Sequence, residues 1–263
     1  IYFMGKDNIP FHTIIWPAII MGMNSANSGE NITHIPEPGY LALESNVPAN
    51  EYLMLQGGQF SKSRRHGIWL PSFLSRFEPD TLRYYLSINM PEGHDTDFRW
   101  DEFVDRVNNE LIGTYANFVH RVMTLTHRIP SDGGNPLSQF FDSSKHIEHS
   151  SHVQTLMSEA ILSMERQRFK EALRSIMSIA QLGNSILQSA APWEHLEKFN
   201  SKEARDSLSA LGYSWTLCRG LAVALRPFIP FQSDRLWTML GEVDDIDTIL
   251  WDEAFTYDDL NWN

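Results

Sequence analysis

Residues 57–65 have the composition of a phosphate-binding loop. Two glycines precede a cluster in which Ser61 and Ser63 flank Lys62, and Arg64 and Arg65 follow. A lysine places a compact positive charge on a phosphate, and serine hydroxyls donate hydrogen bonds to its oxygens. Such a loop suits a phosphate chain whose charge shifts during a reaction. The alternative is a solvated basic loop, because short runs of Lys and Arg are weak motifs.

A second group of residues has the chemistry to bind unpaired bases. Asn117 and Arg121 are four residues apart in a strong helical pattern, so they share a face opposite the apolar stripe. Arg106 and Arg128 fall on the same face. Amide and guanidinium groups hydrogen-bond to base edges and stack on bases of single-stranded RNA loops. An ordinary solvated helix face is the alternative.

Trp193 is a candidate for base stacking. It follows Pro192, which ends an expected helix, so its indole can be presented at a surface and stack on a base. The chain has 8 tryptophans, however, and most of them must pack in the interior. Core packing is therefore the alternative for Trp193.

Three histidines, His146, His149 and His152, are spaced by three residues. Glu148 lies between them, but no Cys or carboxylate completes a tetrahedral ligand set at the usual spacing. We therefore expect a polar loop or helix start there, and no metal site in this chain.

Helical periodicity dominates the chain from residue 100 onward. Apolar residues recur at steps of three and four over residues 101–128, 169–190 and 208–225. Weaker patterns predict helices over residues 153–164 and 233–240. Long helices with single apolar stripes, joined by short breaks, predict a helix bundle.

The region before residue 96 is mixed in character. Residues 1–4 and 52–55 are typical of strands, residues 9–23 of an apolar helix, and residues 81–88 of a short helix. We therefore predict a mainly α protein, in which a smaller α/β region precedes the helix bundle.

The composition is that of a soluble protein with a sizeable core. Of 263 residues, 42% are apolar, and the single cysteine, Cys218, excludes an intrachain disulfide and fits a reducing compartment. The longest apolar run, residues 14–23, is too short to span a bilayer, and no charged segment of a signal peptide precedes it. We expect a cytoplasmic protein without a membrane partner.

The net charge of −12 is unfavourable for a nucleic-acid partner, because phosphate binding needs Lys and Arg. After Arg235, however, there are eight acids and no Lys or Arg, so the rest of the chain has 33 − 8 = 25 acids against 21 bases, a difference of −4. Composition therefore neither supports nor excludes RNA. The acidic tail contains Trp251, Phe255 and Trp262, through which it either packs or stays mobile.

The cationic loop resembles the KMSKS signature of the class I aminoacyl-tRNA synthetases, here in the form Gln59-Phe60-Ser61-Lys62-Ser63. Gln59 replaces the first lysine of the signature, which puts phosphate binding at that position in doubt. Lys62 matches the second lysine, which in the family stabilises the ATP triphosphate at the activation transition state. The resemblance implies a catalytic role for Lys62 and ATP binding by Ser61, Lys62 and Ser63.

The opening segment, residues 3–12, is similar to the block that precedes this signature in methionyl-tRNA synthetases of the archaeal and eukaryotic form. In that family the aspartate matched by Asp7 lies at the substrate cleft, and the positions of Asn8 and His12 line the methionine pocket. From residue type alone, a histidine that follows Phe11 in an apolar helix is more often a hydrogen-bonded core residue.

Residues 103–121 resemble the start of the anticodon-binding bundle of the same family, where the residues matched by Asn117 and Arg121 contact the CAU anticodon. The family also has a tryptophan after a proline that stacks on the anticodon, and Trp193 matches it. Asn184 matches a recurring asparagine to which we assign no role. The zinc site of the family belongs to an inserted domain that this chain does not contain.

The resemblance implies three parts. Residues 1–35 correspond to the C-terminal part of the Rossmann-like class I catalytic fold, residues 36–95 to the connecting stem-contact region with the KMSKS-like loop, and residues 96–263 to the α-helical anticodon-binding domain. No His-x-Gly-His sequence occurs in the chain, although the family needs one in the N-terminal half of the nucleotide fold to bind ATP.

We therefore expect an incomplete enzyme, inactive in adenylation by itself, whose partner is the missing N-terminal part of the same protein. The parent enzyme would activate methionine with ATP and Mg²⁺ and transfer it to tRNA(Met). Two alternatives stay open. One is a stand-alone tRNA-binding module without catalysis, and the other is a helical scaffold protein whose motif matches are coincidental.

Overall fold

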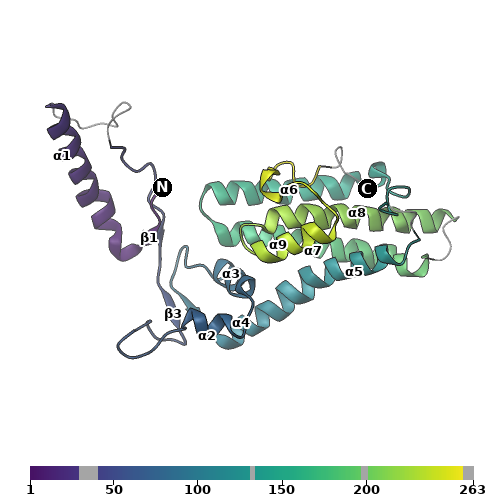
Figure 1. Cartoon of the computed structure of the whole chain (residues 1–263), viewed down its shortest axis with the longest axis horizontal. Helices are drawn as coiled ribbons and strands as arrows, with labels where there is room; N and C mark the ends of the chain where they lie inside the picture. Colours follow the sequence, from purple (N-terminus) through teal and green to yellow (C-terminus); the bar gives the residue numbers. More distant parts are fainter. Residues whose placement is uncertain (30–40, 131–133, 197–200, 257–263) are drawn as a thin grey trace. The chain divides into compact units, whose positions relative to one another are not determined.

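The computed structural model describes residues 1–29, 41–130, 134–196 and 201–256, drawn as ribbon in Figure 1. The chain forms two compact units. The first contains Ile1–Gly67 and Met90–Phe98, and the second contains Ile68–Asn89 and Arg99–Asn263. This division follows contacts within the chain and does not test the three predicted functional parts, which stay a prediction.

Two short parallel strand pairs organise the first unit. β1 (Met4–Gly5) pairs with β2 (Ala49–Asn50), and β3 (Leu53–Leu55) pairs with β4 (Thr96–Phe98). The predicted strand at residues 52–55 is confirmed, and the one at residues 1–4 begins only at Met4. Strands of two or three residues have no detectable period, so β2 and β4 had no sequence signal.

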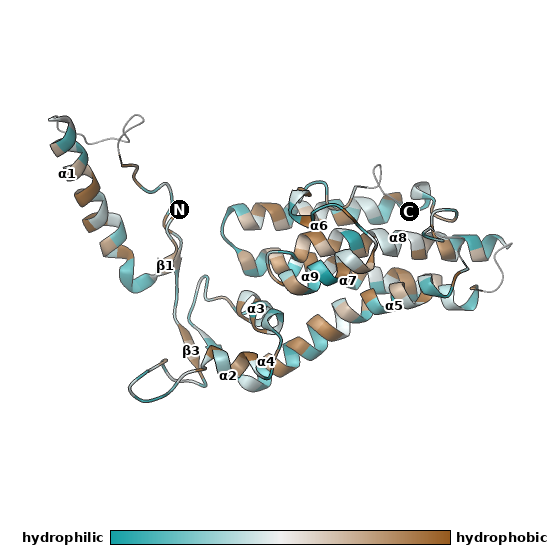
Figure 2. Ribbon diagram, viewed as in Figure 1, coloured by the Kyte–Doolittle hydropathy of each residue, from teal (hydrophilic) through white to brown (hydrophobic). Residues whose placement is uncertain are grey.

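A helical stretch follows β1 and confirms the helix predicted over residues 9–23. It contains the 3-10 turn η1 (Lys6–Asn8), the π-helical η2 (Phe11–Ile15) and α1 (Trp16–Ser28). Gly29 ends the helix at φ 74°, a left-handed conformation that glycine adopts without a Cβ penalty. Figure 2 shows apolar residues along the ribbon of α1. Ile14 and Ile15 at the end of η2 and Ile19 and Met23 in α1 are exposed.

The second unit is the predicted helix bundle. One continuous helical run contains α4 (Trp100–Arg106), the π-helical η3 (Val107–Ala116) and α5 (Asn117–His127). The remaining long helices are α6 (Ile147–Glu165), α7 (Phe169–Ala190) and α8 (Lys202–Leu225), and the shorter α9 (Pro230–Met239) follows them. Shorter elements are α2 (Leu70–Leu74), α3 (Pro79–Ile88), η4 (Ser143–His146), η5 (Pro192–Glu194) and η6 (Ile246–Thr248).

The core of the bundle lies around α8, which packs against α5, α7 and α9 and is buried along most of its length. Gly183 of α7 permits a close approach to α5, because a Cβ at this position would lie 2.4 Å from Cζ of Phe118. This approach brings Nδ2 of Asn184 to 2.9 Å from the carbonyl oxygen of Thr114. Packing therefore fixes the α5–α7 pair at the level where the candidate RNA-binding residues occur.

The π-helical stretch η3 interrupts the α-helical phase of the helix predicted over residues 101–128. Thr114 Oγ1 donates to the carbonyl oxygen of Asn109, five residues earlier, at 3.1 Å. Because π winding changes the number of residues per turn, faces assigned by α-helical periodicity do not continue across it. Arg106 pairs with Glu102 and Glu110 at 2.9 Å each, so it contributes no free positive charge.

Arginines of the bundle neutralise several acids of the C-terminal region. Arg226 pairs with Asp247 at 2.9 Å and with Asp234 at 3.1 Å. Arg219 pairs with Glu242 at 2.7 Å, and both side chains are nearly buried. The pairs with Glu242 and Asp247 attach the described acidic segment to α8 and to its C-cap residue.

The described part of the acidic tail also packs through its aromatic residues. Phe255 is buried against Gly220, and Trp251 contacts the core from a half-buried position. Trp262 lies outside the described residues. None of the described helices is both long and apolar enough to cross a bilayer.

Candidate functional sites

The cationic loop, residues 56–66, begins with a tight hairpin turn after β3. Gln56 and Gly57 both have positive φ, at 50° and 76°, as in the primed turns that match strand twist. Leu55 and Gly58 exchange backbone hydrogen bonds of 2.7 and 2.9 Å. The Asp97 carboxylate accepts the N–H of Gly57 at 2.9 Å, so β4 holds the base of the loop.

The tip of the cationic loop is a second turn. Ser61 and His66 exchange backbone hydrogen bonds of 2.8 and 2.9 Å, and Arg65 closes the turn at φ 52°. Oγ of Ser61 lies 3.2 Å from Oγ of Ser63, so the two predicted serines lie together. His66 Nε2 donates to the carbonyl oxygen of Leu55 at 2.8 Å and attaches the far side of the loop to β3.

Three cations project from this turn. Lys62, Arg64 and Arg65 are exposed, and none of them forms an ion pair with another described residue. Positive charges within four residues, without a local counter-charge, favour the binding of a polyanion. The geometry therefore suits contact between Lys62 and a phosphate, with the two serine hydroxyls as further donors.

Asp7 and Asn8 follow the carboxyl end of β1, the edge at which parallel sheets bind ligands. Asn8 Nδ2 lies 3.4 Å from Oδ1 of Asp7, and both side chains are exposed. A Cβ on Gly5 would lie 2.8 Å from the same oxygen, so Gly5 leaves room for the Asp7 carboxylate. The structure thus places Asp7 and Asn8 side by side.

His12 lies about one helical turn after Asn8, and its ring faces Tyr2, just before β1. Its ring makes an edge contact with Tyr2 at 5.8 Å between centroids, and its Nδ1 is buried without a hydrogen-bond partner among the described residues. A buried polar nitrogen without a partner is unusual in a folded protein. The described residues form no hydrogen bond or ion pair between this segment and Ser61, Lys62 or Ser63.

Lys6 is a structural cation that the sequence did not reveal. Its amine forms ion pairs with Glu51 and, at 2.8 Å, with Asp95, and it lies 4.4 Å from the centroid of the Tyr52 ring. Hydrogen bonds to Asp95 and Glu51 raise the pKa of the Lys6 amine above its usual range. Lys6 therefore links the end of β1 to the segments of the same chain that contain Glu51 and Asp95.

The bundle brings Arg121 and Trp193 together. The guanidinium carbon of Arg121 lies 5.3 Å from the centroid of the Trp193 ring, within the range of a cation–π contact. Its nitrogens lie 3.5 Å from Oδ1 of Asn184 and 3.4 Å from Oε1 of Gln188. Both side chains of the Arg121–Trp193 pair are half-buried, so each keeps an accessible part.

Backbone geometry at the end of α7 positions Trp193. Ala191 ends α7 in the left-handed region at φ 42°, and Pro192 then begins the short turn η5 that contains Trp193. A non-glycine residue in this region is uncommon. Asn117 is exposed on α5, and no described residue forms a hydrogen bond with its side chain.

Two residues of α7 complete this arrangement, which we name the Arg121 cluster (Asn117, Arg121, Asn184, Gln188 and Trp193). Asn184 donates to the carbonyl oxygens of Thr114 and Ala180 at 2.9 and 3.1 Å, which directs its oxygen toward Arg121. Gln188 was missed in the sequence, although it lies one helical turn after Asn184 and so shares its face.

Of the three spaced histidines, His146 belongs to the packing of the bundle, His149 is half-buried and His152 is exposed on α6. His146 is buried, stacks on Tyr213 at 4.6 Å between centroids, and lies 3.0 Å from Oγ of Ser209. Burial and the nearby His149 lower the pKa of the His146 imidazole. Within the described ranges, no group of three or more His, Cys, Asp or Glu residues could hold a metal ion.

Comparisons with known proteins assign the chain to a family. Residues 1–123 match the family model described as tRNA synthetases class I (M), a range that includes the whole first unit and part of the second. Residues 143–257 match the model described as the anticodon binding domain of methionyl tRNA ligase. The chain belongs to the methionyl-tRNA synthetase family.

Curated relatives agree with this assignment. The methionine–tRNA ligase of Dehalococcoides mccartyi strain 195 is 39% identical over 250 residues, which cover 95% of this chain and 41% of the relative. The enzyme of Thermococcus onnurineus is 37% identical over 242 residues, which cover 92% of this chain and 31% of the relative. The chain therefore spans about two-fifths or less of the length of these relatives.

Solved structures share the fold. The methionyl-tRNA synthetase of Mycobacterium tuberculosis, in complex with methionyl-adenylate, superposes with a TM-score of 0.72 at 20% identity. The match covers 92% of this chain and 44% of the other. At this identity the likeness shows the fold alone: a helical anticodon-binding domain after a smaller class I catalytic region.

Proposed function

We propose that this chain is the part of a methionine–tRNA ligase that supplies the KMSKS-like loop and binds the anticodon of tRNA(Met). The complete enzyme activates methionine with ATP and Mg²⁺ and then transfers the methionyl group to the tRNA. The observation that best supports this proposal is the contact between Arg121 and Trp193, supported by Asn184 and Gln188.

In the activation step, the cationic loop stabilises charge on the pyrophosphate that leaves ATP. Lys62 has no ion partner among the described residues, so its charge is available to the phosphate oxygens. Ser61 and Ser63 add donors from the same turn. Interactions that strengthen as charge develops lower the barrier rather than merely binding the substrate.

The segment after β1 forms part of the amino-acid and ATP cleft. Asp7 lies at the carboxyl end of a parallel strand, where an ionised carboxylate can accept a hydrogen bond from an ammonium or hydroxyl group. Asn8 lies beside it with both donor and acceptor atoms. The unpaired Nδ1 of His12 provides a further polar atom at this end of the unit.

In tRNA recognition, the Arg121 cluster binds unpaired anticodon bases. The Trp193 indole offers a stacking face, and the Arg121 guanidinium and Asn117 amide offer groups for base edges. Because Asn184 and Gln188 hold the guanidinium from one side, its orientation is fixed before the RNA arrives. Pre-organisation of this kind lowers the entropic cost of binding.

Binding to anticodon stem-loops tests the proposal. We expect the chain to bind a CAU stem-loop in preference to one with a single anticodon base changed, at fixed salt concentration. Replacing Trp193 by Leu should weaken CAU binding about tenfold, given about 1–3 kcal/mol per stacked base. Trp215→Leu is the matched control, because Trp215 is also half-buried against the core but lies about 20 Å along α8 from the start of that helix.

The outcome separates the candidate functions. Weak binding that is indifferent to the anticodon and falls with salt would leave only nonspecific electrostatics and favour a scaffold protein. A CAU preference establishes anticodon recognition but does not distinguish the synthetase from a stand-alone tRNA-binding module. Methionine-dependent pyrophosphate exchange makes that distinction: it should require the remaining part of the enzyme, and exchange by the pure chain would contradict its predicted inactivity.

A further inference from the structure

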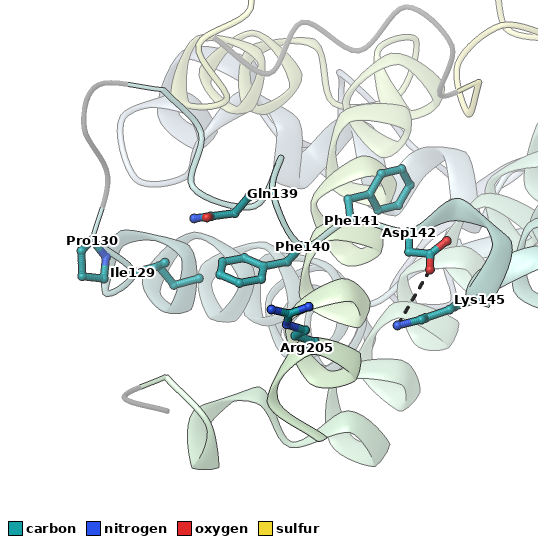
Figure 3. A pocket seen from close by; sticks show the side chains of 8 residues that line it. All are labelled: Ile129, Pro130, Gln139, Phe140, Phe141, Asp142, Lys145 and Arg205. Atoms are coloured by element: carbon teal, nitrogen blue, oxygen red, sulfur yellow. Dashed lines mark ion pairs between the residues drawn. The ribbon is translucent and has the colours of Figure 1, made fainter. Parts of the chain in front are cut away.

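A pocket of about 690 Å³ opens beside the first turns of α8, and the proposed function does not use it. Figure 3 shows the ring of Phe140 next to Ile129, with the Arg205 guanidinium directed toward the same space. Gln139 and Lys145 also line the pocket. The lining therefore combines an aromatic face, an amide and two cations.

The wall that contains Phe140 is fixed to the bundle. A Cβ on Gly212 would lie 3.2 Å from Cβ of Phe141, so this phenylalanine packs closely on α8. Its ring lies parallel to that of His146 at 6.3 Å between centroids. The N–H of Asp142 donates to Oγ of Ser209 at 3.1 Å. Phe141 and Asp142 therefore anchor the chain directly after Phe140. The Phe140 ring is half-buried, packs partly against the core and also lines the pocket.

The two cations of the pocket differ in their partners. Lys145 pairs with Asp206 at 2.6 Å and lies 3.8 Å from Asp142, so its charge is largely compensated. The Arg205 side chain is exposed and forms no ion pair with a described residue. Arg205 is therefore the group in this pocket that is available to bind an anion.

The pocket lies at the same end of the bundle as Trp193. Ser207, two residues after Arg205, donates through Oγ to the carbonyl oxygen of Ala190 at 2.6 Å, at the end of α7. Ile129 lies two residues after the end of α5, and Arg121 lies six residues before that end, which is about 9 Å along the helix. Figure 1 shows the start of α8 and the ends of α5 and α7 at one end of the bundle.

We propose that this pocket binds an unpaired nucleotide that flanks the anticodon, with its base on Phe140 and its phosphate on Arg205. The inference rests on the proposed anticodon recognition and adds a second subsite to it. Unpaired bases stack on aromatic rings, and guanidinium groups bind phosphate oxygens through paired donors. The exposed amide of Gln139 can hydrogen-bond to the base edge, since Asn and Gln side chains provide both donors and acceptors.

The test uses the whole chain and a CAU stem-loop. Phe140→Leu keeps an apolar side chain at this position but removes the aromatic face, and it should weaken binding about tenfold. Arg205→Gln should weaken binding severalfold and reduce the slope of log K against log salt by about 0.7, the value for one contact with a single-stranded phosphate. Arg174→Gln is the matched control, because Arg174 is also exposed but lies about 24 Å from the end of α7.

The base that enters the pocket is identified with stem-loops in which one loop nucleotide outside the anticodon is abasic. One such substitution should weaken binding to the unmodified chain and have no effect on the Phe140→Leu variant, since the two changes remove the same contact. Unchanged affinity and salt slope in both variants, with the CAU preference intact, would overturn the second subsite alone. If the unmodified chain showed no preference for the CAU stem-loop, the proposed function itself would be overturned. Thermal unfolding of each variant shows whether it is folded.

Discussion

The two units of this chain hold their functional side chains in opposite ways. In the bundle, Arg121 is half-buried and surrounded by Trp193, Asn184 and Gln188. In the first unit, Lys62 is exposed at the tip of a turn and has no ion partner among the described residues. One unit fixes the geometry of a guanidinium, and the other leaves a point charge free.

This difference matches what each proposed task requires. Discrimination between bases depends on the direction of hydrogen bonds, so the groups that make them must be oriented in advance. Stabilising a phosphate chain during bond cleavage depends mainly on charge that can follow the moving oxygens. The bundle therefore uses helix packing to position its site, whereas the described hydrogen bonds between the cationic loop and β3 or β4 lie at the base of the loop and include those of His66 and Asp97.

The two units also differ in how completely their apolar side chains are buried. In the bundle, Leu173, Ile176 and Leu208 are fully buried. In the first unit, Ile14 is 66% exposed and Phe3 is 53% exposed. Because a region with few buried apolar contacts opens more easily, we expect local stability to be lower in the first unit than in the bundle.

The largest effect predicted from this comparison is on catalysis. In the complete enzyme, Lys62→Ala should lower methionine-dependent pyrophosphate exchange about 10²- to 10³-fold, as does the loss of one donor to a developing charge elsewhere. Steady-state exchange assays measure this loss. The control is Arg64→Ala in the same turn, which should have a smaller effect because Lys62 alone matches the catalytic lysine. Equal effects of the two changes would show that only the summed charge matters.

The next largest effect is on stability, and it is tested by replacing one helical glycine in each unit. Gly183→Ala introduces a Cβ at 2.4 Å from Phe118 and should destabilise the bundle by about 1–3 kcal/mol. Gly22→Ala in α1 meets no atom within 4 Å and should stabilise its helix by up to about 1 kcal/mol. Urea unfolding measures the first change, and amide exchange of α1 measures the second. A neutral Gly183→Ala would mean that the α5–α7 pair is not tightly packed.

A smaller effect follows from exchanging Arg for Lys in each unit. Arg121→Lys should weaken CAU stem-loop binding about three- to tenfold, because lysine lacks the planar group that contacts Trp193 and two amides. Arg64→Lys, in the cationic loop, should leave pyrophosphate exchange within about twofold, since a point charge suffices there. If Arg121→Lys bound CAU as tightly as the unchanged chain, the orientation of the guanidinium would not matter.

The smallest predicted effect is a pH dependence of bundle stability. Burial and His149 lower the pKa of His146, so the unfolded chain takes up a proton at a higher pH than the folded chain. The free energy of unfolding should therefore fall as pH decreases through about 6.5, by at most about 1.4 kcal/mol per pH unit for one proton. Unfolding of the unchanged chain and of His146→Gln at pH 7 and pH 5.5 measures the slope. Identical slopes would show that His146 does not cause it.

The sequence predicted the bundle well because its signals are local. The apolar stripes of residues 169–190 and 208–225 correspond to helices that end at Ala190 and Leu225. The Pro192–Trp193 step also had a local signal, because proline ends a helix. The sequence therefore supplied Arg121 and Trp193 as candidates, although the contact between them required the close approach at Gly183.

Other features depend on contacts between distant residues and had no local pattern. Lys6 bonds to Asp95, 89 residues away in the chain. The strands β2 and β4 contain two and three residues, too few for a period to be detected. The π-helical winding of η3 was also absent from the prediction, because a 3.6-residue period was assumed throughout the helix.

The central claim is that the two units make separable contributions, which is tested most directly by measuring two quantities on the same pair of variants. In the complete enzyme, Lys62→Ala should lower pyrophosphate exchange at least about 10²-fold and leave the Kd for a CAU stem-loop unchanged. Trp193→Leu should raise that Kd about tenfold and leave pyrophosphate exchange unchanged. A Lys62 variant that loses stem-loop affinity, or a Trp193 variant that loses exchange activity while still folded, would contradict the account.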